Sequence, residues 1–188
     1  MPLAHADDHV VTREGHLRLA LFEPDQPGNF GAMLRLGACL GVALEVIEPC
    51  GFPLDERRIR RAAMDYARHV AWRRHADLSA FLACASAEAR RLVLLSAGAR
   101  TAYHRFAFGP RDVLVLGSES RGASAALRAA CAAEVRIPIG SGLRSLNLAT
   151  AGAIGLAEAL RQLDAWPGAG DGAGVDGLEE GVDGDGRA

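Results

Sequence analysis

The segment from residue 136 to 162 constrains the fold more than any other part of the sequence. A short apolar run leads into it, a loop with Gly140 and Gly142 follows, and the segment ends in a long run rich in Ala and Gly. This order predicts a buried strand over Val135–Ile139, a tight loop and then a helix. Small side chains let other backbone approach the helix closely, so the loop amides above its first turn form a candidate small-molecule site.

The start of that helix has a simpler alternative interpretation. Ser145 and Asn147 both stand where an N-cap belongs, just before the apolar run. The segment would then be an ordinary strand–loop–helix unit in which Ser145 is only a cap.

Strands and helices alternate along the rest of the chain. The apolar patterns and turn residues predict strands at Leu17–Phe22, Val42–Ile47, Val70–Trp72, Arg91–Ser96 and Asp112–Leu116, and helices at 32–40, Leu78–Ala87 and Ser124–Ala130. Residues 23–31, with two prolines and two glycines, are expected to form a loop, and 97–108 a connector. Strand, helix and strand at this spacing predict an α/β fold with a mostly parallel sheet and helices on both faces.

Length and composition favour one domain with a real core. Of the 188 residues, 49% are apolar and only 5% aromatic. We expect residues 17–166 to form the domain, residues 1–16 to be a disordered extension, and residues 167–188 to be a flexible, acidic, Gly-rich tail. No membrane span or signal peptide is recognisable, which favours the cytoplasm. The cysteines, Cys39, Cys50, Cys84 and Cys131, are widely spaced and are expected to be buried apolar residues, neither disulfides nor metal ligands.

The charge of the central region points toward a polyanion. Residues 17–166 hold 14 of the 23 acidic and 19 of the 21 basic residues, a net charge of +5, and every basic residue is Arg. A predicted helix after Asp55 carries a cluster of arginines close to an aromatic residue, which suits RNA: Arg57, Arg58, Arg60, Arg61 and Tyr66. Trp72, Arg73 and Arg74 continue the pattern. The alternative is a solvated helix whose arginines pair with acids.

Three segments that follow predicted strands stand out: 27–31, 117–122 and 140–147. In an open parallel sheet such loops gather at the carboxyl ends of the strands and bind ligands there. A nicotinamide-dinucleotide fold is the rival interpretation, since Gly28 and Gly31 follow the first strand and Glu48 ends the second. Its fingerprint, however, needs a third glycine where Gln26 stands. No nucleophile elbow, zinc-ligand spacing or phosphate loop indicates covalent or metal catalysis.

The same three segments carry a family resemblance. N-F-G-A-M-L-R, L-G-S-E-S-R-G and I-P-I-x-x-x-x-R-S-L-N-L, in this order, resemble the three motifs of the SPOUT superfamily of RNA methyltransferases. E-P-x-x-P-x-N-x-G-x-x-x-R-L, I-E-P-x-G-F and R-R-I-R-R-A-A-M-D-Y narrow the resemblance to the tRNA wobble-nucleotide ribose 2'-O-methyltransferases. The likeness runs from about residue 19 to 163. The sequence departs from the family pattern at Ser118 (often Pro), Ala32 (usually Asn) and Ala149 (usually Ser).

The resemblance implies a deep trefoil knot in the C-terminal part, a homodimer, and S-adenosyl-L-methionine bound by the knot loops largely through backbone groups. By motif, the cofactor residues would be Leu95, Gly117, Glu119, Ile137, Ser145 and Leu146. Arg35, Asn29 and Asn147 would be the catalytic residues, and the arginine helix would bind the anticodon stem of tRNA. Because a guanidinium is essentially always protonated, we assign Arg35 to the phosphate and the developing alkoxide.

The resemblance therefore predicts methyl transfer to the ribose 2'-oxygen of the wobble nucleotide, C34 or modified U34, in the anticodon loop of tRNA. Two alternatives remain open at this point. One is a methyltransferase acting on the ribose 2'-oxygen of ribosomal RNA. The other is a non-catalytic RNA-binding homologue whose cofactor pocket has decayed through Ser118 and Ala149.

Overall fold

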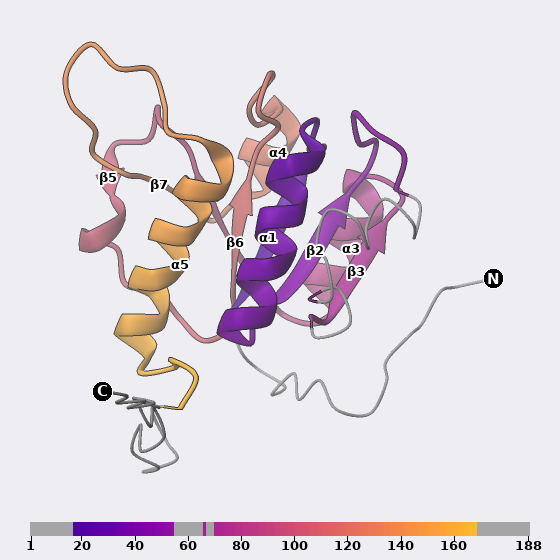
Figure 1. Cartoon of the computed structure of the whole chain (residues 1–188), viewed down its shortest axis with the longest axis horizontal. Helices are drawn as coiled ribbons and strands as arrows, with labels where there is room; N and C mark the ends of the chain where they lie inside the picture. Colours follow the sequence, from indigo (N-terminus) through magenta and orange to yellow (C-terminus); the bar gives the residue numbers. More distant parts are fainter. Residues whose placement is uncertain (1–16, 55–65, 67–69, 169–188) are drawn as a thin grey trace, which may run out of the picture.

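The computed structural model describes residues 17–54, 66 and 70–168. Within these ranges the chain forms a seven-stranded, fully parallel sheet in the order β3-β2-β1-β6-β4-β7-β5 (Figure 1). The strands are β1 (Arg18–Phe22), β2 (Ala43–Ile47), β3 (Trp72–His75), β4 (Arg91–Leu95), β5 (Thr101–Ala102), β6 (Asp112–Leu116) and β7 (Ala133–Arg136). The helices are α1 (Pro27–Leu40), α3 (Leu78–Ala87), α4 (Ala125–Ala130) and α5 (Leu148–Leu163), with a short 3-10 helix, η2 (Tyr103–Arg105).

The central strands are covered on both faces. In β1, Leu19 and Leu21 belong to the apolar cluster under α1 and α5, whereas Ala20 and Phe22 belong to the cluster under α3 and α4. Successive strand residues point to opposite faces, so a strand buried on both sides must be apolar throughout. Figure 1 shows the same layering, with α1 and α5 side by side over one face of the sheet and α3 and α4 behind it. The predicted α/β class, parallel sheet and two-sided helix layer are confirmed.

The small residues of α5 bring that helix close to the sheet and to α1. A Cβ added at Gly152 would lie 2.4 Å from Met33 Cε and 2.9 Å from Leu116 Cδ1. One added at Gly155 would lie 3.0 Å from Leu114 Cδ2. A larger residue at either position would displace these side chains from their packed positions in the core. The close approach sets the first turn of α5 directly over the carboxyl end of β6.

Helix α1 begins five residues earlier than the sequence patterns predict. Pro27 occupies the first helical position, where a missing N–H costs nothing, and Gln26 is the N-cap residue with extended backbone. Phe30 N donates to Gln26 O at 3.1 Å, closing the first turn. The expected 27–31 loop is therefore the start of a helix, and Asn29 is a helical residue rather than a loop residue.

Other differences arise from pairing between distant strands. β7 lies at 133–136, two residues before the predicted start, because Val93–Leu95 of β4 pair with Ala133–Val135. β3 lies at 72–75 rather than 70–72 because it pairs with β2 over Leu44–Ile47. The predicted connector contains β5 and η2, since Thr101 pairs with Val135. A two-residue strand of this kind has no pattern of its own in the sequence.

The four cysteines are free thiols. Cys50, Cys84 and Cys131 are half-buried, and burial raises the pKa of the Cys50 and Cys131 thiols, to about 12 and about 11. Cys39 is exposed, so the prediction that all four are buried is wrong for this residue. It lies near the end of α1, on the helix side turned away from the sheet.

The described residues contain neither a membrane-spanning helix nor a cluster of metal-binding side chains. None of the helices there is long and apolar enough to cross a membrane. No group of three or more His, Cys, Asp or Glu side chains in those ranges is arranged to hold a metal ion.

Candidate functional site

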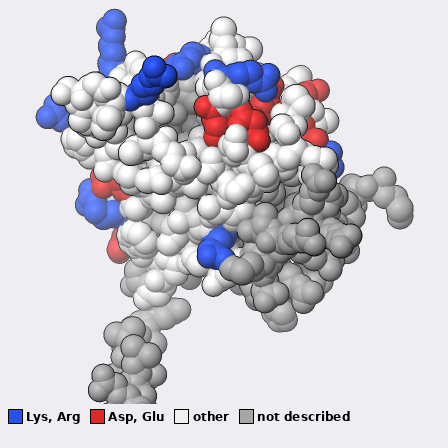
Figure 2. All heavy atoms as spheres, turned by 45° about the horizontal axis from the view of Figure 1, so that its top comes forward, with Lys and Arg blue, Asp and Glu red and all other residues white. Residues whose placement is uncertain are grey.

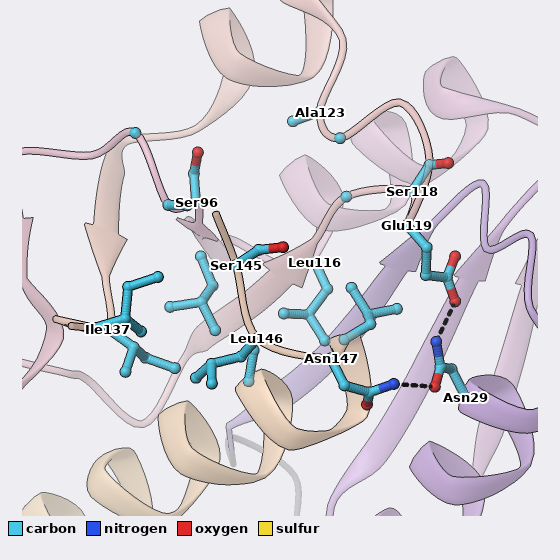
Figure 3. Close-up of a pocket in the computed structure, with 18 of the residues that line it drawn as sticks. Asn29, Ser96, Leu116, Ser118, Glu119, Ala123, Ile137, Ser145, Leu146 and Asn147 are labelled. Atoms are coloured by element: carbon cyan, nitrogen blue, oxygen red, sulfur yellow. Dashed lines mark hydrogen bonds between the residues drawn. The ribbon is translucent and has the colours of Figure 1, made fainter. Parts of the chain in front are cut away.

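A cavity of about 610 Å³ opens at the carboxyl ends of β4, β6 and β7 (Figure 3). Its volume lies in the range of small-molecule sites. It is lined by Gln26, Asn29, Leu95, Ser96, Ala97, Gly98, Leu116, Gly117, Ser118, Glu119, Gly122, Ala123, Arg128, Ile137, Ile139, Ser145, Leu146, Asn147, Leu148 and Ala151. Every cofactor residue predicted by motif is in this set, as are two of the three predicted catalytic residues, Asn29 and Asn147. The structure thus brings together distant segments, including Asn29 and Asn147, which are 118 positions apart in the chain.

One wall of the cavity is the 117–122 turn, which folds back tightly on itself. Ser118 N donates to Gly122 O at 3.0 Å, and Gly122 N donates to Ser118 O at 2.8 Å. A Cβ at Gly117 would lie 2.5 Å from Gly122 C and 2.6 Å from Ala123 N, both backbone atoms. Only glycine can occupy position 117 while the turn stays closed. Gly117 therefore sets the shape of this wall.

Several side chains and backbone N–H groups bind the 117–122 turn to the segment that precedes α1. Ser118 Oγ donates to Asp25 Oδ2 at 2.9 Å, and the Ser120 backbone N–H donates to the same oxygen at 3.1 Å. The Ser120 hydroxyl donates to it as well. Glu119 Oε2 accepts from Asp25 N at 2.8 Å, and Arg121 Nη2 lies 2.7 Å from Glu23 Oε2. We call this set of contacts between 118–121 and 23–25 the latch.

Asp25 is the centre of the latch, and the sequence analysis missed it. The hydrogen bond from the Ser120 side chain, joined by those from Ser118 and the Ser120 N–H, holds the pKa of Asp25 below its ordinary value of 3.8, although burial opposes this. Gly51 allows the close approach, because a Cβ there would lie 2.7 Å from Asp25 Cβ. The signal that could have found Asp25 was the pair of short polar side chains at 118 and 120, which need acceptors when they face a packed loop.

A chain of side-chain hydrogen bonds joins three elements at the mouth of the cavity. Asn147 Nδ2 donates to Asn29 Oδ1 at 2.9 Å, and Asn29 Nδ2 donates to Glu119 Oε1 at 3.0 Å (Figure 3). The Asn29 amide is thereby fixed in one orientation, since its oxygen and its nitrogen have different partners.

Asn147, not Ser145, is the N-cap of α5. Its Oδ1 accepts from Ala149 N at 2.9 Å and from Thr150 N at 3.2 Å. The alternative in which Ser145 serves only as a cap is therefore wrong. Ser145 is instead an exposed residue on the cavity wall. The capping role leaves the Asn147 amide nitrogen for Asn29.

The chemistry of the walls fits S-adenosyl-L-methionine. Leu95, Leu116, Ile137, Ile139 and Leu148 form an apolar lining suited to a purine ring, and hydroxyl, amide and backbone groups stand beside it. The described residues place two charged side chains in the lining, Glu119 and Arg128. The two departures from the family pattern at the cofactor site do not block the cavity, because Ser118 turns its hydroxyl to Asp25 and Ala149 contributes its N–H to the helix cap.

Arg35 does not line the cavity. It lies on the exposed side of α1, six residues after Asn29, or about 9 Å along the helix axis. Its guanidinium carbon stands over the Tyr66 ring, 5.0 Å from the centroid, and Tyr66 is 37% exposed. Two residues predicted to contact RNA are thus in contact with each other. The arginine helix (Arg57, Arg58, Arg60 and Arg61) lies outside the described residues.

The later part of the arginine-rich stretch is structural. Arg73 Nη1 lies 2.8 Å from Glu88 Oε1, and Arg74 is paired with Glu48. Trp72 packs edge-on against Phe30 at a centroid distance of 6.2 Å. For Arg73 and Arg74 the alternative of pairing with acids is thus confirmed, and contact of this stretch with RNA stays a prediction. Figure 2 shows basic side chains along the upper edge of the molecule and acidic side chains beside them at the upper right.

A family profile and individual relatives both relate this chain to RNA methyltransferases. Residues 16–157 match the profile described as the SpoU rRNA Methylase family. A protein of Beijerinckia indica subsp. indica named tRNA (cytidine(34)-2'-O)-methyltransferase is 51% identical over 147 residues, which cover 78% of this chain and 92% of the relative. A protein of Escherichia coli K12 with the same name is 39% identical over 155 residues, 81% of this chain and 97% of the relative.

Two solved structures extend the likeness to three dimensions. One, described as "Structural insights into the 2-OH methylation of C/U34 on tRNA", has a TM-score of 0.74 and 36% identity, covering 80% of this chain and 98% of its own. The other is the SpoU methyltransferase AviRb from Streptomyces viridochromogenes in complex with the cofactor AdoMet. It has a TM-score of 0.75 and 27% identity, covering 87% of this chain and 66% of its own.

Proposed function

Since the chain belongs to the SpoU rRNA methylase family, we propose that it methylates the ribose 2'-oxygen of the wobble nucleotide in a tRNA anticodon loop, using S-adenosyl-L-methionine. The nucleotide is C34 or a modified U34. Relatives that bear this activity in their names cover 78% and 81% of the chain. The observation that carries the proposal is the convergence of Gly117, Ile137 and Ser145 on one cavity, with Asn29 and Asn147 at its mouth.

The cavity residues would align the reaction rather than take part in it covalently. Bound in the cavity, the sulfonium of the cofactor supplies an already activated methyl group. The protein must hold the 2'-oxygen in line with the carbon–sulfur bond, and positioning of this kind accounts for a large share of catalytic rate. The oriented Asn29 amide and its partner Asn147 stand where a ribose would enter.

Arg35 would act on the RNA side of the site. As the 2'-hydroxyl loses its proton, negative charge develops on the oxygen that attacks the methyl group. A guanidinium beside the adjacent phosphate stabilises that charge and fixes the nucleotide. Tyr66, already in contact with Arg35, offers a ring on which an unpaired base can stack. The arginine helix at 57–61 would bind the anticodon stem.

The assembly and the knot belong to the same proposal. The chain would form a homodimer in the cytoplasm, and its C-terminal part would hold the trefoil knot. In support of the knot, β7 pairs with β4 on the side opposite β6, and the chain then returns to pack α5 over β6. In support of the dimer, the 140–147 loop exposes Leu143 at 70% and Leu146 at 37%, unusual fractions for large apolar side chains.

The direct test is mass mapping of RNA methylated by the purified protein. Unmodified tRNA and ribosomal RNA are each incubated with the protein and S-adenosyl-L-methionine, and the methylated nucleotide is located by nuclease digestion. A 2'-O-methyl group at position 34 of tRNA is the expected result. Methylation confined to ribosomal RNA would move the activity to the alternative substrate. No methylation together with no calorimetric binding of the cofactor would favour the non-catalytic homologue.

The role of Arg35 has its own test. Arg35→Ala should slow single-turnover methylation of tRNA by about 100-fold, the usual effect of removing a group that stabilises developing charge. Arg161→Ala, an exposed arginine paired with Glu158 at the far end of α5, is the control and should keep the wild-type rate. Equal rates for Arg35→Ala and wild type would remove Arg35 from the mechanism. The affinity for tRNA should also fall steeply as salt rises.

A further inference from the structure

Arg128 is the one positively charged side chain that lines the cavity within the described residues. It belongs to α4, and no motif in the sequence pointed to it. The geometry points to Arg128 and Ser96 as the subsite that binds the carboxylate at the amino-acid end of the methyl donor. This inference rests on the proposed function, because it assumes that S-adenosyl-L-methionine occupies the cavity.

The Arg128 guanidinium is held from two sides. Its Nη1 lies 2.6 Å from Oε2 of Glu134, the second residue of β7, and its Nη2 donates to Ser96 Oγ at 3.1 Å. A guanidinium has five N–H donors, so these two bonds leave three for a ligand. An arginine fixed in this way loses little side-chain freedom when it binds a carboxylate, which it can contact through two parallel bonds.

Ser96 supplies a second donor beside Arg128. Its hydroxyl oxygen accepts from Arg128, and its O–H donates to no side chain or backbone group among the described residues. Its backbone N–H is already bound to Val135 O at 2.9 Å, which fixes the residue at the cavity edge. The Ser96 hydroxyl proton and the remaining Arg128 N–H groups therefore form a small cluster of donors, as an anionic group requires.

The charge of the cavity is polarised, which sets the orientation of the donor. Glu119 lies with Asn29 on one side of the cavity, and Ser96 lies on the opposite side (Figure 3). A ligand carboxylate beside Glu119 would meet like charge, whereas beside Arg128 it meets opposite charge. The carboxylate end would thus point away from Asn29 and Asn147, leaving that side for the RNA.

The ion pair between Arg128 and Glu134 contributes too little to stability to account for an arginine at this position. Arg128 and Glu134 side chains are 40% and 30% exposed, and pairs this exposed contribute little to folding. The arginine at the same place in another helix, Arg161 in the last turn of α5, is also paired with a glutamate but lies outside the cavity. Arg161 therefore serves as a matched control for loss of an exposed ion pair.

The test compares two ligands by calorimetry on the full chain. Wild type, Arg128→Ala, Arg128→Lys and Arg161→Ala are each titrated with S-adenosyl-L-methionine and with its decarboxylated analogue, which keeps the sulfonium and the adenosine. The wild type should prefer the carboxylated ligand by about 10-fold to 100-fold, the usual effect of a charged hydrogen-bonded pair. Arg128→Ala should reduce that preference to about twofold, with Arg128→Lys between the two and Arg161→Ala like the wild type.

The affinity for the decarboxylated analogue reports on the cavity itself. It should be the same in Arg128→Ala and wild type, which shows that the variant folds and keeps the rest of the site. If Arg128→Ala keeps the wild-type preference for the carboxylated ligand, whether or not its tRNA binding is weaker, the proposed subsite is wrong. The proposed function is then unaffected. If the wild type binds neither ligand, the proposed function fails with it.

Discussion

The two loops that face each other across the cavity are built in opposite ways. In the 117–122 turn, each of the four residues from 118 to 121 binds the segment before α1 through a side chain or a backbone N–H. In the other loop, every residue from 140 to 147 is exposed. Residues 140–146 make one hydrogen bond with the described part of the chain, from Leu143 N to Gly140 O at 3.4 Å. One wall is pre-organised and the other is open.

This difference has a physical consequence for binding. A loop whose polar groups are already paired loses little entropy when a ligand arrives, whereas an open loop must be ordered at the expense of the ligand or a partner. The latch therefore defines where the cofactor lies, and the 140–147 loop is the part of the site that a bound cofactor or a second subunit would order. Four variants test this division, from the largest expected effect to the smallest.

Gly117→Ala should be the most damaging single change in either loop. The added Cβ would meet backbone atoms at 2.5 and 2.6 Å, so the turn must open. We expect a loss of about 3 kcal/mol in the free energy of unfolding and at least tenfold weaker binding of S-adenosyl-L-methionine. Urea denaturation and calorimetry measure the two effects. Gly140→Ala is the control, because its Cβ would meet only Leu143 Cδ1, at 3.8 Å. Equal effects at both positions would contradict the contrast between the loops.

Asp25→Asn should release the latch without opening the turn. The amide offers a weaker acceptor to Ser118 and Ser120, so we expect a loss of about 1–2 kcal/mol in the free energy of unfolding. The pKa of Asp25 is lowered in the folded protein, so the folded state favours the ionised form. The stabilisation is therefore complete above the ordinary pKa of 3.8 and disappears as the pH falls through the lower folded pKa.

Denaturation of wild type and Asp25→Asn from pH 6 to pH 2.5 measures this dependence. The difference between the two proteins should shrink as the solution becomes acidic. A difference that stays constant over the whole range would show that the charge of Asp25 does not stabilise the latch.

Asn147→Asp separates the two functions of the α5 cap. The carboxylate still accepts from Ala149 N and Thr150 N, so the free energy of unfolding should change by less than about 0.5 kcal/mol. The donor to Asn29 is lost, and we expect methylation of tRNA to slow about tenfold. Asn147→Ala is the comparison and should also lose about 1 kcal/mol of stability. An Asn147→Asp variant with the wild-type rate would show that the Asn29 orientation is not needed.

Leu143→Ser should have the smallest effect on the folded chain. The side chain is 70% exposed, so stability in dilute solution should change by less than about 0.5 kcal/mol. If the 140–147 loop lies in a dimer interface, the same variant should shift the sedimentation profile toward the monomer. A monomeric wild type would remove the proposed interface.

Local patterns predicted much of the architecture. The boundaries of α3 and β6 are those expected, and β1, β2 and β4 differ by one residue at one end. These elements are apolar runs or clear helices bounded by turn residues, so local composition and burial agree. The start of α1 was misplaced because Pro and Gly are turn residues in most contexts, whereas here Pro27 begins a helix whose first turn buries Phe30 in the core.

Site residues that belong to a sequence motif could be predicted. Site residues that are known only from their contacts in the folded chain could not. Gly117, Ile137 and Ser145 follow from their places after strands. Asp25 and Arg128 do not, since Asp25 binds residues more than 90 positions away and Arg128 of α4 binds Ser96, which follows β4. Which loop residues come into contact depends on the register in which the strands pair.

The amino-acid sequence by itself determined that this chain forms a parallel α/β sheet with glycine-bearing turns at its carboxyl edge. Apolar periodicity and turn chemistry are local properties, and they are sufficient for that much. The tertiary structure alone decided that one turn is bound by Asp25 and the other stays open, and that Asn147 rather than Ser145 caps α5. Those outcomes depend on which polar groups meet across the folded sheet, and buried groups that meet no partner carry a free-energy cost that local sequence does not record.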